Sequence, residues 1–194
     1  NNAGDANNPG FLAPVNNPWN LSDIGYSSAP TFGDIDNDGD MDLLSTDVYG
    51  AFYYFENIGT ASVPTFASAV VDTFGLSAYI VPGETRGSSH PSLVDIDNDG
   101  DLDVMTGGRF GHTYYFENTG SASSPNFLGA VQDTFGLSQI VPGNVGSNNT
   151  APAFGDIDND GDIDCIVGER YGVQYYFENT GSASNPSFSA FTIN

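Results

Sequence analysis

The chain has 194 residues, three arginines as its only lysine or arginine side chains, and a formal net charge of -22 at pH 7. Nucleic acid and anionic membrane surfaces are therefore poor partners, because both are negatively charged. The chain is rich in glycine and aromatic residues, lacks sustained helical periodicity and has no apolar run near the ~20 residues of a membrane span, so it predicts an all-β protein.

The sequence repeats with a period of 61 residues. The stretch Asp34–Asp42 recurs at Asp95–Asp103 and at Asp156–Asp164. A fixed period of this kind indicates one supersecondary unit that is used several times. We therefore predict one continuous array. Its parts are residues 1–29, 30–90, 91–151 and 152–194.

The first part, residues 1–29, is an incomplete unit. Asn2–Phe11 aligns with Asn179–Phe188, and residues 17–22 align with residues 72–77. The chain thus holds four copies of a fourth-strand segment but three copies of the other strands. We expect further copies of the chain to bind at this surplus strand or at the open edges of the repeated sheets, which would produce a ring or a filament. The alternative is that the sequence is a fragment of a longer array of the same units, a β-propeller.

The first complete unit has four predicted strands. They span residues 30–35, 41–46, 51–56 and 64–70, and a connection over residues 72–90 leads to the next unit. Four short strands with a long connection are typical of a β-propeller blade. Alternate residues of Phe52–Phe55 would face opposite sides of the blade, so we expect aromatic side chains to pack between blades.

An acidic loop follows the first strand of every unit, with aspartate at positions 1, 3, 5, 7 and 9 and glycine at position 6. Five like charges this close repel strongly unless a cation lies among them, and oxygen ligands favour a hard ion such as calcium. We predict about three calcium ions, one for each loop. The predicted metal residues are Asp34, Asp36, Asp38, Asp40, Asp42, Asp95, Asp97, Asp99, Asp101, Asp103, Asp156, Asp158, Asp160, Asp162 and Asp164.

The loop spacing excludes an EF-hand. That motif needs a glutamate at position 12, where the three loops have Ser45, Thr106 and Val167. The loops instead precede buried strands, which predicts a hairpin. Glycine at position 6 is expected to adopt a positive φ that lets the chain curl around the ion.

The third unit shows a family resemblance most fully. Pro152–Asp164, followed by Ile166–Gly168 and Tyr175–Asn179, is similar to the FG-GAP or VCBS repeat, the calcium-loop blade of integrin α-chain propellers and many secreted bacterial proteins. The resemblance covers nearly the whole chain. It implies that calcium takes side chains from loop positions 1, 3, 5 and 9 and the main-chain oxygen of position 7. It also implies an extracellular or cell-surface location.

Other polar residues are weaker candidates. Arg109 and Arg170 occupy equivalent turns beside an aromatic residue and could contact a sugar or an acidic group, although local salt bridges explain them as well. Asn20 and Asn148 begin sequons that accept glycan in a suitable secretory host. Cys165 is expected to be a buried core residue.

The sequence does not predict an enzyme. His90 and His112 occupy non-equivalent positions, and neither lies in a nucleophile motif. The acids Glu56, Glu117 and Glu178 recur in every unit, so we expect them to have a structural role in each blade and not a catalytic one. The favoured function is a calcium-binding extracellular protein that acts in adhesion or as a self-assembling surface component. The alternative is a carbohydrate-binding propeller module, either on its own or as part of a polysaccharide-active enzyme.

Overall fold

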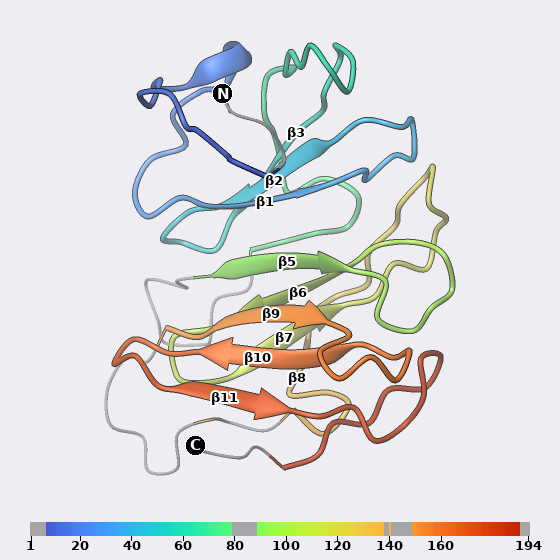
Figure 1. The fold of residues 1–194 in the computed structure, drawn as a ribbon. Coiled ribbons are helices and arrows are strands. Elements are labelled where there is room, and N and C mark those ends of the chain that lie inside the picture. The colour runs from blue at the N-terminus through green and yellow to red at the C-terminus, as the bar shows by residue number, and fades with distance from the viewer. Residues whose placement is uncertain (1–6, 79–88, 138–139, 141–148, 191–194) are drawn as a thin grey trace.

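A computed structural model describes residues 7–78, 89–137, 140 and 149–190, and these residues form an all-β fold (Figure 1). The only helix in these residues is the short 3-10 turn η1 (Pro18–Asn20). The strands are β1 (Ala29–Gly33), β2 (Asp42–Thr46), β3 (Phe52–Phe55), β4 (Val70–Val71), β5 (His90–Val94), β6 (Asp103–Gly107), β7 (Thr113–Phe116), β8 (Val131–Gln132), β9 (Ala151–Gly155), β10 (Asp164–Gly168) and β11 (Gln174–Phe177).

The strands of the described residues form three antiparallel sheets. Their orders are β1-β2-β3-β4, β5-β6-β7-β8 and β11-β10-β9. Figure 1 shows the sheets stacked one after another in chain order. Each sheet corresponds to one 61-residue unit, so the predicted all-β architecture of repeated blades is confirmed.

The fourth strand is shorter than predicted. Residues 64–70 were expected to pair throughout, but Phe66 forms an isolated bridge with Asn57 and the regular strand β4 comprises two residues. The physical reason is a change of register: Asn57 pairs with Phe66 but Tyr54 pairs with Val70, so the fourth strand has one extra residue, a bulge, between these two pairs. At the turn, Oδ1 of Asn57 also accepts the N–H groups of Gly59 (3.1 Å) and Thr65 (3.0 Å). In the third unit, the equivalent of β4 lies outside the described residues.

The core lies between the sheets, as alternation along the third strands predicted. Phe52 of the first sheet meets Phe116 of the second edge to face, with ring centroids 5.2 Å apart. Between the second and third sheets, Met105 and Tyr115 share a buried cluster with Phe177. Cys165 is fully buried in that cluster, which agrees with its predicted core role.

The connection after each sheet crosses onto the next one. The carbonyl of Phe74 accepts the N–H of Phe127 at 2.7 Å, and the carbonyl of Phe135 accepts the N–H of Phe188 at 2.7 Å. The carbonyl of Trp19 accepts the N–H of Phe66 at 2.9 Å in the same way. Residues 17–22 thus take the place on the first sheet that residues 72–77 take on the second.

Gly75 should be intolerant of a side chain. It has φ +88°, and a Cβ there would lie 2.3 Å from the carbonyl oxygen of Phe127. We expect Gly75→Ala to lower the free energy of unfolding by about 1–3 kcal/mol in a denaturant titration. Gly129→Ala is the matched control, since a Cβ there meets nothing within 4 Å. Equal effects of the two variants would contradict the proposed contact.

Candidate metal centre

Each acidic loop joins the first strand of a sheet to the second. In the first unit Gly33 ends β1 opposite Asp42, so the strand pairing closes the loop between them. Position 6 has the predicted positive φ: +98° at Gly39, +98° at Gly100 and +100° at Gly161. The asparagines at position 4 are also left-handed, with φ between 57° and 64°, which the sequence analysis did not anticipate.

The loop aspartates accept hydrogen bonds from the main chain of their own loop. Oδ1 of Asp34 accepts the N–H of Asp38 at 3.0 Å, and its Oδ2 accepts the N–H of Gly39 at 3.1 Å. Oδ1 of Asp38 accepts the N–H of Asp40 at 3.0 Å. Equivalent bonds are present in the other two loops. These bonds curl the chain so that its carboxylates converge.

The side chains at positions 1, 3 and 5 converge in all three loops. Each set offers ligand atoms that all lie within 4.8 Å of one another. Two oxygens on opposite sides of a calcium ion are separated by about 4.8 Å, since each lies about 2.4 Å from the ion. The three sets are Asp34, Asp36 and Asp38; Asp95, Asp97 and Asp99; and Asp156, Asp158 and Asp160.

Some carboxylate oxygens in these loops are buried without a hydrogen-bond donor. In the first loop they are Oδ1 of Asp36 and Oδ1 of Asp40. The same is true of Asp97 and Asp101 in the second loop and of Asp162 in the third. A buried, unpaired carboxylate oxygen is costly unless a cation satisfies it. The residues therefore fit a bound cation, and position 7 offers a side-chain oxygen as well as the implied carbonyl.

The carboxylate at position 9 lies deeper and is held by the blade. Asp42 is 1% exposed; its Oδ1 accepts the N–H of Asn57 at 2.8 Å, and its Oδ2 accepts the hydroxyl of Tyr54 at 3.1 Å and the N–H of Ile35 at 3.2 Å. Position 9 is not in the converging triplet. Asp103 and Asp164 accept the equivalent N–H of Asn118 and of Asn179. Position 9 therefore ties each loop to the third strand of its sheet.

Tyr54 and Asn57 are partners of the loop that were not predicted from the sequence. The 61-residue period contains the signal, because Tyr115 and Tyr176 repeat the tyrosine and Asn118 and Asn179 repeat the asparagine. The period alone does not say which repeated residues touch.

The loops resist ionisation when no cation is present. Burial raises the pKa of Asp42 to about 6 and that of Asp103 to about 7, against an ordinary value of 3.8. Burial, followed by the charge of Asp38, also raises the pKa of Asp36 and of Asp40. A divalent cation would remove both causes, because it compensates the desolvated charge and the mutual repulsion.

The third loop differs from the first two in exposure. The carboxylates of its triplet are exposed, whereas those at positions 1 and 3 of the other loops are half-buried. Isoleucine at position 2 shows the same contrast: Ile35 is 5% exposed, Ile96 1% and Ile157 52%. In the first two loops the next sheet of the chain covers this isoleucine.

The arginines predicted as ligand contacts lie in separate turns. The guanidinium of Arg109 lies 5.6 Å from the ring centroid of Phe110. Arg170 lines a cavity of about 380 Å³ together with His90, Glu169 and Gln174. Arg109 does not line this cavity, but its carbonyl accepts the N–H of Asn149, which does (3.3 Å).

Of the two predicted glycosylation positions, the structure describes only Asn20. Nδ2 of Asn20 donates a hydrogen bond to the carbonyl of Phe66 at 3.0 Å. A glycan on Asn20 would have to share the nitrogen that makes this bond. Asn148 lies outside the described residues.

The fold and the loops define the class: an all-β repeat protein whose blades each carry an aspartate loop able to hold a metal ion. Comparison with protein families matches residues 34–106, and again residues 95–167, to the FG-GAP-like repeat. The chain therefore belongs to the FG-GAP-like repeat family. No curated protein sequence matches the chain significantly.

Membership has two coarse consequences. FG-GAP-like repeats often bind calcium, and the proteins that contain them are typically extracellular and non-enzymatic. In the described residues, no helix is long and apolar enough to cross a membrane.

Acidification should stabilise the calcium-free protein. The raised pKa values of Asp42 and Asp103 mean that the folded state binds protons more tightly than the unfolded chain does. Their stabilising contribution is complete below about pH 4 and is lost as the pH rises through about 6 to 7. We expect the Tm in chelator, followed by circular dichroism, to rise between about pH 8 and about pH 5.

With saturating calcium this trend should flatten or reverse, because protons then compete with the ion. The double variant Asp42→Asn, Asp103→Asn is the control, and its calcium-free Tm should depend less on pH. A wild-type Tm in chelator that falls on acidification would contradict the assignment.

Proposed function

We propose that the chain is an extracellular calcium-binding repeat protein in which one calcium ion braces each blade, and that it serves adhesion or the assembly of a surface structure. The observation that supports this most directly is the same in all three loops. Three carboxylates converge within 4.8 Å, and carboxylate oxygens are buried without donors.

Calcium suits these loops better than magnesium. Each loop offers only oxygen donors, from several aspartates and the main chain, and calcium accepts six to eight such ligands in flexible geometry. Magnesium requires a stricter octahedron and retains several waters.

The brace would act through position 9. Calcium held by positions 1, 3, 5 and 7 fixes the loop, and Asp42 transfers that order to Asn57 and Tyr54 of the same sheet. Blades made rigid in this way present fixed faces and turns to a partner. No step of this role requires a chemical reaction.

Calcium titration tests the proposal. We expect isothermal titration calorimetry to find about three calcium ions per chain. Calcium at a hundred times the Kd should add about 2.7 kcal/mol for each occupied site. For a chain of this size, that stabilisation corresponds to a rise in Tm of at least about 5 °C per site. Magnesium at the same concentration should have a smaller effect. A Tm unchanged by both calcium and chelator would refute the brace.

A single-ligand variant sharpens the test. Asp36→Asn removes one charge at a converging, buried position and should weaken calcium binding at the first loop at least roughly tenfold. Asp23→Asn is the matched control, because Asp23 lies outside the loops and its Oδ1 accepts the nearby N–H of Gly25 at 2.8 Å. Equal calcium affinity of the two variants would argue against the first loop as a site.

One observation favours glycan binding as a second function. The side chains of His90, Arg170 and Gln174 line the cavity of about 380 Å³, and such groups can hydrogen-bond the hydroxyls of a sugar. The carboxylate oxygens of Glu169, which also lines the cavity, already accept the N–H groups of Tyr171 and Val173. Binding to a glycan array that is lost in Arg170→Ala would support this function. Binding that persists in the variant would remove the cavity as its basis.

A further inference from the structure

The third sheet exposes an apolar surface that the other two sheets bury. We call Ile157, Ile166 and Tyr176 the trailing face. Their equivalents in the first sheet, Ile35, Leu44 and Tyr54, are 5%, 1% and 5% exposed. Those in the second sheet are Ile96, Met105 and Tyr115, which are likewise buried. By contrast, Ile157 is 52% exposed and Ile166 is half-buried.

The first sheet carries the complementary surface, of which Phe32 is exposed while Leu43 (6% exposed) and Phe55 (2% exposed) are buried beneath the N-terminal segment. We call Phe32, Leu43 and Phe55 the leading face. Phe32 is 56% exposed, whereas the equivalent Leu93 and Phe154 are partly buried against the preceding sheet. The N-terminal segment packs on Leu43 and Phe55 through Leu21 and Ile24 and leaves Phe32 uncovered.

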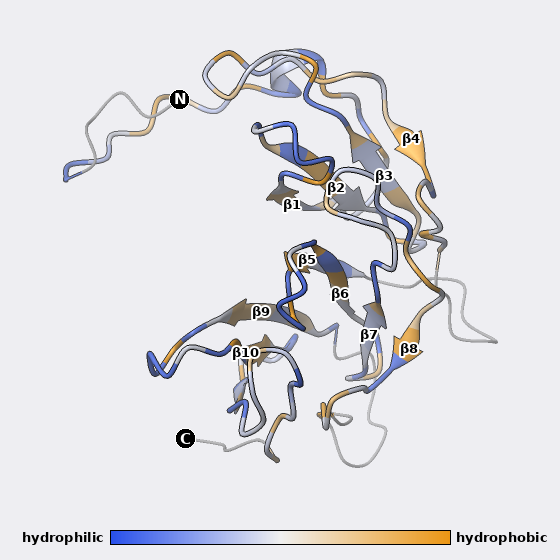
Figure 2. Ribbon diagram, turned by 90° about the vertical axis from the view of Figure 1, so that its right-hand side faces the viewer, coloured by the Kyte–Doolittle hydropathy of each residue, from blue (hydrophilic) through white to orange (hydrophobic). Residues whose placement is uncertain are grey.

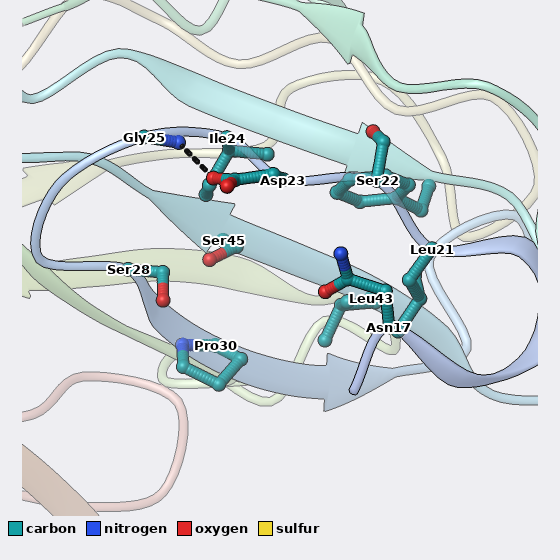
Figure 3. A pocket seen from close by; sticks show the side chains of 11 residues that line it. Asn17, Leu21, Ser22, Asp23, Ile24, Gly25, Ser28, Pro30, Leu43 and Ser45 are labelled. Carbon is teal, nitrogen blue, oxygen red and sulfur yellow. Dashed lines mark hydrogen bonds between the residues drawn. The ribbon is translucent and has the colours of Figure 1, made fainter. Parts of the chain in front are cut away.

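A cavity of about 200 Å³ remains in the leading face (Figure 3). It lies between Leu21 and Ile24 on one side and Leu43 and Phe55 on the other. In the second sheet the side chains equivalent to Leu43 and Phe55 are Val104 and Phe116, and both are packed against Leu44 and Phe52 of the preceding sheet. The cavity therefore lies where a preceding sheet would place its side chains.

We propose that the leading face of one copy of this chain binds the trailing face of a second copy, so that the contact repeats the packing seen twice inside each chain. This inference rests on the proposed assembly function. The internal interfaces identify the occupant, because each joins a trailing-type face to a leading-type face of the same sequence pattern. A self-complementary pair of different faces associates head to tail, and it either closes into a ring or continues as a filament.

Trp19 supplies a specific contact. Its counterparts Phe74 and Phe135 each pack edge to face on a tyrosine, Tyr54 or Tyr115, with centroids 5.0 Å apart. The next tyrosine in this series is Tyr176 of the trailing face. Trp19 has the same left-handed backbone as Phe74, with φ near 55°, but its side chain is 44% exposed. In the head-to-tail contact Trp19 would pack on Tyr176 of the second copy.

Addition of the surplus N-terminal strand is a less suitable route. Residues 7–16 are exposed, and Figure 2 shows the N-terminal end of the described chain extending away from the sheets. The strand would have to pair beside β11, where the chain's own segment already binds: the N–H of Ser189 donates to the carbonyl of Glu178 at 2.8 Å.

Calcium would favour this contact electrostatically. Copies with a net charge of -22 repel one another, and three bound ions reduce that charge to -16. The third loop adjoins the trailing face through Ile157, so the second copy would cover it as the next sheet covers the first two loops.

Complementary variants test the contact on the 194-residue chain. We expect wild type in calcium to show, by mass photometry and light scattering, a mass that is a multiple of the monomer. Phe32→Glu, on the leading face, and Ile166→Glu, on the trailing face, should each raise the dissociation constant at least tenfold and give monomers. A mixture of the two variants retains one intact pair of faces and should give a heterodimer that grows no further.

Variants of Phe11 and Trp19 test which residues the contact requires. Phe11→Glu is the matched control, because Phe11 is 83% exposed on the N-terminal segment and should leave assembly unchanged. Trp19→Ala should weaken assembly, whereas Trp19→Phe, which restores the residue of the other repeats, should retain it. The fluorescence of Trp19, the only tryptophan, should shift to shorter wavelength as wild type assembles.

The outcomes separate the two proposals. Wild type that stays monomeric in calcium, or a Phe32→Glu variant that assembles like wild type, overturns the contact. Loss of assembly in Phe11→Glu but not in Phe32→Glu overturns it in favour of strand addition. Calcium titration of the same variants is independent, so calcium binding without assembly rejects only the contact.

Discussion

Repulsion among carboxylates is the constraint on which this structure depends. Each nine-residue loop brings five aspartates together, and hydrogen bonds from the main chain satisfy only some of their oxygens. The upward pKa shifts at Asp36, Asp42 and Asp103 express the same cost, since burial and neighbouring charge both disfavour ionisation. A cation turns this cost into a stabilising interaction, and it does so three times along the chain.

One side chain links the metal loop to the packing between sheets. The hydroxyl of Tyr54 donates to Asp42 at 3.1 Å, and its ring packs on Phe74 with centroids 5.0 Å apart. Phe74 in turn accepts the N–H of Phe127 in the next sheet. Order in the loop is therefore connected to the contact between neighbouring blades through two residues. Tyr115 and Phe135 repeat the arrangement one unit later.

Periodicity made much of the fold predictable. It located the first three strands of each unit to within about two residues, and it located the loops, because the same local sequence returns every 61 residues. It also aligned residues 17–22 with residues 72–77, and the two segments do make the same contact. The fourth strand was overestimated because its pairing changes register by one residue between Phe66 and Val70, and a bulge of this kind has no signal in the period.

Other properties were beyond the reach of local sequence. The loops of the first and third units are nearly identical in sequence, yet Ile35 is buried and Ile157 is exposed. The difference comes from the neighbouring sheet rather than from the loop. For the same reason the period identified Tyr54 as a repeated residue but not as a partner of Asp42, since a period marks every repeated position equally.

The connection that crosses from one sheet onto the next affects how the number of repeats can change during evolution. The hydrogen bond from Phe127 to Phe74 and the close approach at Gly75 recur unchanged at Phe188, Phe135 and Gly136. Each blade thus contacts its neighbours through one standard joint. Duplication or deletion of a whole 61-residue unit would preserve every joint. The length of the array is therefore free to vary by recombination, without a new core having to be selected.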